Sequence, residues 1–411
     1  MTRSSGLPVL LALSGLPEEQ TLVAALDRPG VGTTVVRRCV DLADLLAAAT
    51  TRTADVAVVA ADLRRLDREA VAQLTAAGLA VVAVIGPGDD DAVRRMRQLG
   101  VVDLVSADAP VDEIVAIVRS APQGAGIELE SQQLLSLPGE SSPLHGRPLG
   151  RVLTVWGPTG APGRTTVAVT LASEAARRGT ETLLVDADTY GAAVAQVLGL
   201  LDESPGLLAA TRAANAGQLD EDSLARFARQ VAPRLRVLSG SPRPDRWSEL
   251  RASALEAVLE AGRSLAELTV VDVGFCLEQD EELVYDTAAP RRNAATLAAL
   301  SAADVVLAVG SADPVGLQRL LRSLPEARSL TTDEVHVVLN RVRRTSAGQF
   351  AELVQRHAGL TSTAALPYDR AACDLALSSG RSLSEVAMRS PLRHAIAKLG
   401  EQLVTLPSPV G

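Results

Sequence analysis

Apolar runs alternate with amphipathic stretches along the first part of the chain, from about residue 7 to about residue 120. Runs of about five apolar residues predict strands, and each is followed by a stretch with helical spacing. The predicted strands lie at 8–13, 55–61, 79–86 and 102–106, and the predicted helices at 18–26, 67–77, 90–99 and 111–121. This alternation predicts a parallel sheet with helices on both faces.

A second alternation of apolar strands and helical stretches begins at residue 151 and runs to the C-terminal region. Its predicted strands lie at 151–156, 182–188, 235–240, 268–274, 304–310, 335–340 and 363–367. Between the two parts, residues 121–149 are rich in Gly, Pro and Ser and lack sustained periodicity, which is typical of a linker. We therefore predict an α/β fold class with two doubly wound parallel-sheet domains, residues 1–120 and 150–411.

Composition and charge narrow the classes of function. The chain has 411 residues, 47% of them hydrophobic, and no apolar run approaches the ~20 residues that cross a bilayer. Its three cysteines lie far apart, which argues against a disulfide framework or a zinc site and fits a reducing cytoplasm. A formal net charge of −9 disfavours direct binding to nucleic acid. We expect a cytoplasmic protein, with peripheral membrane association left open and stable membrane insertion disfavoured.

The stretch VWGPTGAPGRTTVAV, residues 155–169, is laid out like a phosphate-binding loop. An apolar strand leads into a turn that contains Gly160 and Gly163, and a helix follows directly. In such loops, backbone N–H groups and the N-terminus of the helix surround the phosphates, and a Ser or Thr hydroxyl holds Mg²⁺. Thr165 stands at the position of that hydroxyl. The alternative is a Gly/Pro-rich turn that binds nothing.

Polar residues at the ends of later strands favour the phosphate-binding interpretation. Asp186 and Asp188 form a D-A-D sequence after one apolar strand, Asp272 ends another, and Asn340 ends a third. In this order, residues 151–404 resemble the MinD/ParA superfamily of P-loop ATPases, whose Walker A loop is deviant. The alternative for the two aspartates of the D-A-D sequence is a pair of strand-end caps, and for Asn340 a turn residue.

The resemblance implies ATP and Mg²⁺ as cofactors and a role for each matching position. Thr165 and Asp272 would bind Mg²⁺, Asp272 through water. Asp186, Asp188 and Arg164 would be catalytic, with one of the two carboxylates orienting the attacking water. The implied cofactor-binding residues are Gly160, Gly163, Arg164, Thr165, Thr166, Asn340, Pro367 and Asp369, with Asn340 at the adenine and Gly274 near the γ-phosphate.

The loop departs from the family where positive charge is most needed. Thr159 replaces the signature lysine that reaches the partner subunit, Arg164 replaces the general P-loop lysine, and Pro158 replaces the first glycine of the motif. Arginine is bulkier than lysine and donates as a planar fork, so the exchange is not conservative in a tight site. Because phosphoryl transfer depends on positioning and electrostatics, we expect ATP binding with slow hydrolysis.

The N-terminal part resembles a response-regulator receiver in topology but not in chemistry. Its first strand leads into Ser14 and Gly15 rather than an acidic pair, Ala60 stands at the phosphoacceptor position, and Ser106 near the lysine position. Asp62 lies two residues too late and is interpreted as a helix cap. A degenerate receiver ahead of this ATPase domain resembles the CpaE/TadZ branch, which includes pilus-assembly localisation proteins and septum-site-determining homologues.

Three functions remain open at this point: a weakly hydrolysing positioning protein, a nucleotide-independent scaffold, and a brisk ATPase in which an arginine restores turnover. The expected partners are proteins at a pole, a septum or a pilus-assembly machine, and a homodimer is left open. Arg291 and Arg292 lie where a mobile switch is expected, and two solvated arginines are the favoured interpretation. The acidic run at 278–282 is expected to face solvent or a partner.

Overall fold

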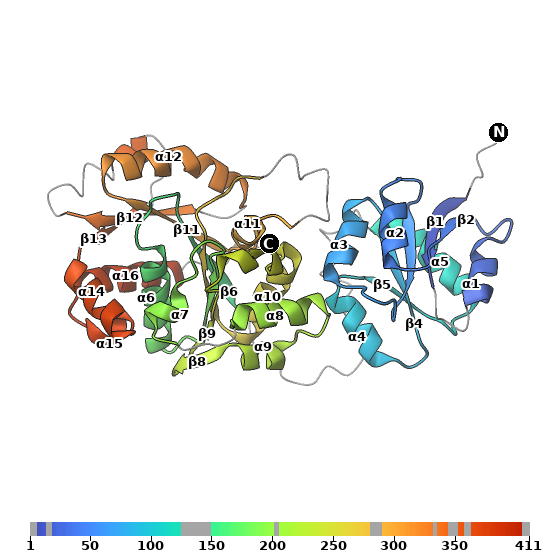
Figure 1. Ribbon diagram of the computed structural model, residues 1–411, viewed down its shortest axis with the longest axis horizontal. Coiled ribbons are helices and arrows are strands. Elements are labelled where there is room, and N and C mark those ends of the chain that lie inside the picture. The colour runs from blue at the N-terminus through green and yellow to red at the C-terminus, as the bar shows by residue number, and fades with distance from the viewer. Residues whose placement is uncertain are drawn as a thin grey trace. The chain divides into compact units, whose positions relative to one another are not determined.

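The computed structural model describes residues 6–13, 19–124, 149–200, 205–279, 290–331, 335–343, 352–356 and 363–404 (Figure 1). These residues form two compact units, chiefly before and after position 148. Each unit is a parallel sheet between helices, so the predicted fold class is confirmed. The predicted linker falls mostly outside the described residues, and the helix before it continues to Gly124.

The N-terminal unit is a five-stranded parallel sheet in the order β2-β1-β3-β4-β5, a flavodoxin-like arrangement. Its elements are β1 (Leu7–Ala12), α1 (Glu19–Leu26), β2 (Thr33–Arg38), α2 (Leu42–Ala49), β3 (Val56–Ala60), α3 (Arg68–Ala76), β4 (Ala80–Ile85), α4 (Asp90–Gln98), β5 (Asp103–Ser106) and α5 (Val111–Gly124). The inner strands β1, β3 and β4 are apolar because both faces of the sheet are covered. Helices α2, α3 and α4 share one buried cluster, and α1 and α5 share the other.

The carboxyl edge of this first sheet lacks receiver chemistry at the positions that the structure describes. Ala60 is fully buried at the end of β3, and Ser106 ends β5 and donates a hydrogen bond to Asp108. The expectation that Asp62 caps a helix is wrong, because α3 begins at Arg68 and its N-terminal N–H groups are capped by Asp67. Ser14 and Gly15 lie outside the described residues.

The C-terminal unit contains an eight-stranded sheet in the order β13-β12-β11-β6-β10-β7-β9-β8, parallel except for the β8–β9 pair. Its first elements are β6 (Arg151–Trp156), α6 (Arg164–Arg177), β7 (Thr182–Ala187), α7 (Val194–Val197), α8 (Gly206–Asn215), α9 (Glu221–Phe227), β8 (Arg229–Ala232), β9 (Leu235–Leu238), the 3₁₀ helix η2 (Pro244–Glu249) and α10 (Ala252–Leu265). The later ones are β10 (Leu268–Val273), α11 (Ala294–Ser301), β11 (Val305–Ser311), α12 (Pro314–Ser329), β12 (Val335–Val342), β13 (Thr363–Pro367), α14 (Arg370–Ser379), α15 (Leu383–Val386) and α16 (Pro391–Val404).

The last helix, α16, packs against α6, the helix that follows the candidate phosphate loop. Its leucine and isoleucine side chains at helical spacing are all buried, as their spacing predicts: Leu392, Ile396, Leu399 and Leu403. Arg393 of α16 also donates two hydrogen bonds, each 2.7 Å, to the carboxylate of Glu174 in α6. This pair is almost enclosed, and it fixes the position of α6 from behind.

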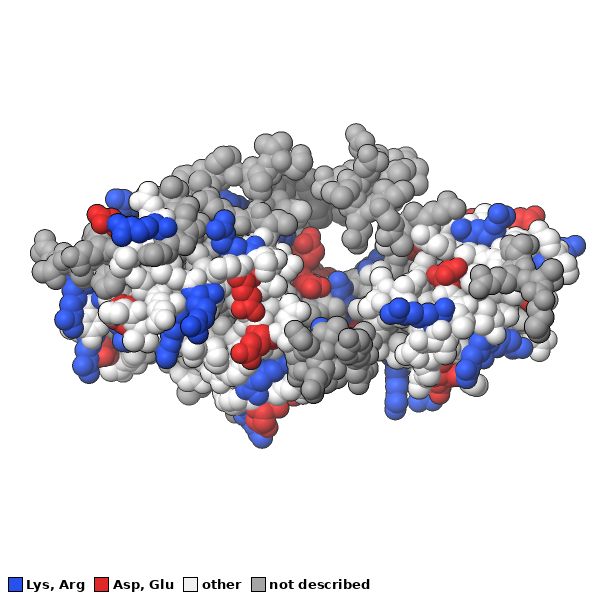
Figure 2. All heavy atoms as spheres, turned by 90° about the horizontal axis from the view of Figure 1, so that it is seen from above, with Lys and Arg blue, Asp and Glu red and all other residues white. Residues whose placement is uncertain are grey.

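The surface carries charges of both signs. Figure 2 shows arginine and acidic side chains intermixed on the visible face of each unit. Among the described residues, no helix is both long enough and apolar enough to cross a membrane.

Candidate functional site

The loop between β6 and α6 needs glycine at three positions, one for lack of space and two for their backbone conformation. A Cβ on Gly157 would lie 2.2 Å from the carbonyl oxygen of Val309 in the neighbouring strand β11. Gly160 and Gly163 have φ angles of +74° and +87°, which residues with a Cβ atom rarely adopt. Gly163 immediately precedes α6, so the free N–H groups of the first helical turn face the loop. This is the local geometry that binds anions.

Arg164 lies within the loop that it helps to form. Its Nη1 donates to the carbonyl of Gly157 at 3.2 Å, and its Nη2 lies 3.6 Å from Oδ2 of Asp188. The side chain is 16% exposed, and its buried Nε has no hydrogen-bond partner in the described part of the chain. The guanidinium therefore has donor capacity left for an additional acceptor in the loop.

Thr165 and Asp272, the two residues expected to hold Mg²⁺, lie in contact. The Thr165 hydroxyl donates to Oδ2 of Asp272 at 2.6 Å, whereas the buried Oδ1 of Asp272 has no partner among the described residues. An unpartnered buried carboxylate oxygen beside a hydroxyl is a donor set that suits a hard cation such as Mg²⁺. Phosphate oxygens and water would complete the coordination, because Mg²⁺ retains waters in sites of this kind.

Asp186 lies beside Asp272 because β7 and β10 are neighbours and the two aspartates are in register. Burial raises the pKa of both carboxyl groups, and nearby negative charge raises it further: the charge of Asp188 acts on Asp186, and the charge of Asp186 acts on Asp272. The Asp186 carboxylate also accepts the backbone N–H of Val194 at 2.9 Å and that of Asp188 at 3.3 Å. Asp186 thus anchors the loop after β7, and a cation at Asp272 would relieve the clustering of negative charge.

Asp188 is the more accessible of the two D-A-D carboxylates and faces Arg164. Its Oδ1 accepts the N–H groups of Tyr190 at 2.8 Å and Gly191 at 3.1 Å, so the loop curls around it. The Asp188 carboxylate lies close to the backbone just after β10, where Gly274 leaves room for it. A Cβ on Gly274 would lie 3.3 Å from Oδ1 of Asp188.

Five predicted cofactor-binding residues line a single cavity of about 450 Å³. They come from three separate segments: Gly163, Thr166, Asn340, Pro367 and Asp369. The volume of this cavity lies within the range found for sites that bind small molecules. The remaining predicted residues, Gly160, Arg164 and Thr165, belong to the adjoining loop and its helix rather than to the cavity wall.

Asn340 joins the cavity to the loop. Its Nδ2 donates to the carbonyl of Pro162 at 2.9 Å, and its Oδ1 accepts the N–H of Arg341 at 2.8 Å. One amide hydrogen and one lone pair remain for a ligand. Asp369 is engaged differently, because it caps α14 through Ala372 and accepts the hydroxyl of Ser390 at 2.7 Å. A structural role therefore accounts for Asp369 without a ligand.

Three residues that sequence reasoning missed belong to the same region. Arg341 has a φ of +58° and lines the cavity, and its guanidinium carbon lies 6.0 Å from the ring centre of Tyr368. Arg319 of α12 donates to the carbonyl of Thr159 at 3.4 Å. The adjacency of Arg341 and Tyr368 to predicted residues was the only available signal, and Arg319 had none.

The interpretation of Arg292 as a solvated arginine is wrong. Its guanidinium carbon lies 4.3 Å from the ring centre of Tyr190 and 5.9 Å from that of Trp247, and its Nε is buried. Arg291 beside it is half-buried. Residues 280–282 of the acidic run lie outside the described residues.

Comparison with known proteins identifies the family of the C-terminal unit. The profile of the CobQ/CobB/MinD/ParA nucleotide binding domain matches residues 153–380, which is more than half of the chain. No curated protein sequence matches the chain at a significant level.

Solved structures are also similar to this chain. A ParA family ATPase from Chlorobium tepidum TLS is 18% identical with a TM-score of 0.52, and the match covers 61% of this chain and 98% of that one. The cell division ATPase MinD from Pyrococcus furiosus is 20% identical with a TM-score of 0.49, over 63% of this chain and 100% of that one. At 18% identity the likeness to the ParA structure shows the fold alone.

Proposed function

Because the chain belongs to the CobQ/CobB/MinD/ParA family of nucleotide-binding domains, we propose that its C-terminal unit binds ATP together with Mg²⁺. The observation that carries this proposal is the continuity of two features. The Thr165–Asp272 pair, with its unpartnered oxygen, adjoins a cavity lined by Gly163 and Asn340. Phosphates would occupy the loop and the base the cavity.

The residues of the chain would divide the work as follows. Thr165 and Asp272 would hold Mg²⁺, which when bound neutralises charge on the phosphate oxygens. Arg164 would offer its guanidinium to a phosphate, and Asp188 would orient a water. Hydrolysis would be slow, because Thr159 supplies no charge and Arg164 is already shared with Asp188 and the Gly157 carbonyl.

We propose further that the chain is a MinD/ParA-type positioning protein of the CpaE/TadZ-like kind, acting in pilus-assembly localisation or septum-site determination. Support comes from the order of its parts, a flavodoxin-like unit ahead of the nucleotide-binding unit. At the described positions where a receiver needs its acceptor and its lysine, the first unit has Ala60 and Ser106. It would therefore recruit a protein partner rather than receive a phosphoryl group.

A nucleotide-independent scaffold is the second candidate, and one observation favours it. Arg164 already contacts Asp188 and the loop carbonyl of Gly157, so the loop is internally satisfied in part without a ligand. In that case the P-loop fold would serve only as architecture for protein interaction.

Isothermal titration calorimetry of the full chain with Mg²⁺-ATP separates the two candidates. The variants are Asp272→Ala and Arg164→Ala, and Asp245→Ala is the matched control because its carboxylate is exposed and forms an ion pair with the equally exposed Arg243. We expect micromolar to sub-millimolar affinity, weakened at least about tenfold by both site variants and unchanged in the control. A folded wild-type chain that binds no ATP up to millimolar concentration would favour the scaffold.

A further inference from the structure

Arg292 is held between two aromatic rings from different parts of the chain. Tyr190 lies in the loop after β7, two residues beyond Asp188, and Trp247 lies in the 3₁₀ helix η2. The Nη2 of Arg292 also donates to the carbonyl of Thr189 at 3.4 Å, and the Thr189 hydroxyl donates to the carbonyl of Arg292 at 3.3 Å. A cation over a ring in a partly desolvated place is attracted by the π-system.

The Tyr190 ring is fixed on its other sides as well. Its hydroxyl donates to Oδ1 of Asn293 at 2.7 Å, and its ring centre lies 4.8 Å from that of Phe275. The Asn293 amide in turn donates to the carbonyl of Glu278 at 2.7 Å. The loop after β7 is thus joined to both ends of the segment that follows β10.

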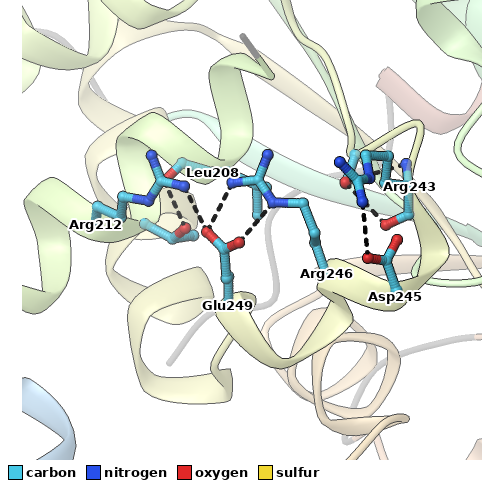
Figure 3. A network of polar contacts seen from close by, with 8 residues as sticks. Leu208, Arg212, Arg243, Asp245, Arg246 and Glu249 are labelled. Atoms are coloured by element: carbon cyan, nitrogen blue, oxygen red, sulfur yellow. Dashed lines mark hydrogen bonds and ion pairs between the residues drawn. The ribbon is translucent and has the colours of Figure 1, made fainter.

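The 3₁₀ helix η2, which carries Trp247, is held in place by contacts of its own. Figure 3 shows Glu249 of η2 between two arginines, Arg246 of the same element and Arg212 of α8. Its carboxylate accepts from Arg246 at 2.6 and 3.0 Å and from Arg212 at 2.5 Å. This bridge ties η2 to α8, so Trp247 belongs to an element with its own support.

We infer that Arg292 is a positioning residue that holds the loop at 188–191 closed and so fixes the carboxylate of Asp188 opposite Arg164. The connection is short, because the N–H groups of Tyr190 and Gly191 are the donors that orient Asp188. The effect of Arg292 on catalysis rests on the proposed function, in which Asp188 orients water. The effect of Arg292 on the position of the loop at 188–191 is independent of the proposed function.

Hydrogen exchange of the full chain without nucleotide tests the loop directly. The variants are Arg292→Ala, Arg292→Lys and Tyr190→Leu. The matched control is Arg291→Ala, since the Arg291 side chain makes no hydrogen bond or ion pair with a described residue. We expect Arg292→Ala and Tyr190→Leu to speed exchange at Tyr190 and Gly191 about tenfold. Arg292→Lys should be intermediate, because it retains the charge without the planar fork.

Peptides from α6 and β10 report whether each variant remains folded. If the peptides from α6 and β10 also exchange faster in Arg292→Ala, that variant is partly unfolded, and the test then rests on Arg292→Lys. Exchange at Tyr190 and Gly191 that is as slow in Arg292→Lys as in the wild type would overturn the inference. Equal exchange in Arg292→Ala and Arg291→Ala would also overturn it. The double variant Tyr190→Leu/Arg292→Ala should add nothing beyond either single change.

Turnover provides the second readout. In a chain that binds Mg²⁺-ATP, Arg292→Ala should lower kcat about tenfold and leave KM within about threefold, because an unfixed Asp188 would misplace the water. An unchanged kcat would overturn the catalytic part of the inference. A wild-type chain that binds no nucleotide would overturn the proposed function instead, while the exchange result would still decide whether Arg292 holds the loop.

Discussion

Gly163 satisfies two demands on the candidate loop at once. Its φ of +87° lies in the left-handed region, and a Cβ at this position would come within 2.3 Å of Nδ2 of Asn340. That amide group holds the loop through the Pro162 carbonyl. A side chain at position 163 therefore disturbs the backbone and its anchor together.

We expect Gly163→Ala to destabilise the C-terminal unit by at least about 1–2 kcal/mol and to abolish Mg²⁺-ATP binding. Gly400→Ala is the control, because Gly400 lies in α16 in ordinary contact with Leu171 and alanine favours a helix. Urea unfolding followed by tryptophan fluorescence suits both, because the two tryptophans, Trp156 and Trp247, belong to this unit. Equal stability of the two variants would contradict the prediction.

At the scale of elements, the sequence predicted the buried strands well but missed one edge strand of each described sheet. An all-apolar run such as β3 is readily recognised, because burial on both faces selects Val and Ala at every position. The edge strands β2 and β8 were missed because each contains arginine and exposed positions and therefore lacks an apolar run. Helix α2, which follows β2, was missed with it.

The candidate site divides in the same way. Residues near the carboxyl end of a strand, such as Asp186 and Asp272, could be located because the carboxyl ends of parallel strands share one edge. The contacts of Arg319 and Arg292 could not, because each joins segments more than 100 residues apart in the chain. Such pairs follow from packing of the whole unit, which local spacing does not encode.

The Arg393–Glu174 pair predicts how strongly α16 is bound to α6. Arg393→Ala should destabilise the C-terminal unit by about 3–5 kcal/mol, because it leaves the Glu174 carboxylate buried without its partner. Arg178→Ala is the matched control: it also removes an ion pair between the α6 terminus and α16, with Glu401, but both side chains are exposed. There we expect about 1 kcal/mol or less, again by urea unfolding. Equal losses would refute the difference.

The bridge that anchors η2 predicts a dependence on pH. Hydrogen bonds from Arg246 and Arg212, together with the charges of both arginines, lower the pKa of Glu249 from 4.5 to about 2. The stabilisation is therefore complete above the unfolded pKa of 4.5 and is lost as the pH falls toward about 2. The difference in unfolding free energy between the wild type and Glu249→Gln should shrink across that interval. A difference independent of pH would show that the charge of Glu249 does not matter.

At the scale of the whole molecule, the two units share an architecture but differ in chemistry. The first sheet ends its third strand in the fully buried methyl group of Ala60, whereas the second presents a cluster of carboxylates at the equivalent edge. We expect that acetyl phosphate with Mg²⁺ adds no phosphoryl group to the N-terminal unit, as measured by peptide mass spectrometry. A phosphorylated Asp62 would contradict this and would restore a receiver function.

The contact between Arg164 and Asp188 also has a thermodynamic consequence. The Arg164 guanidinium is already paired with the Asp188 carboxylate, so a phosphate that binds Arg164 would have to displace that carboxylate. Added salt screens the attraction that is lost as well as the one that is gained. The affinity for a nucleotide should therefore vary less with ionic strength than that of a loop whose cation faces only water.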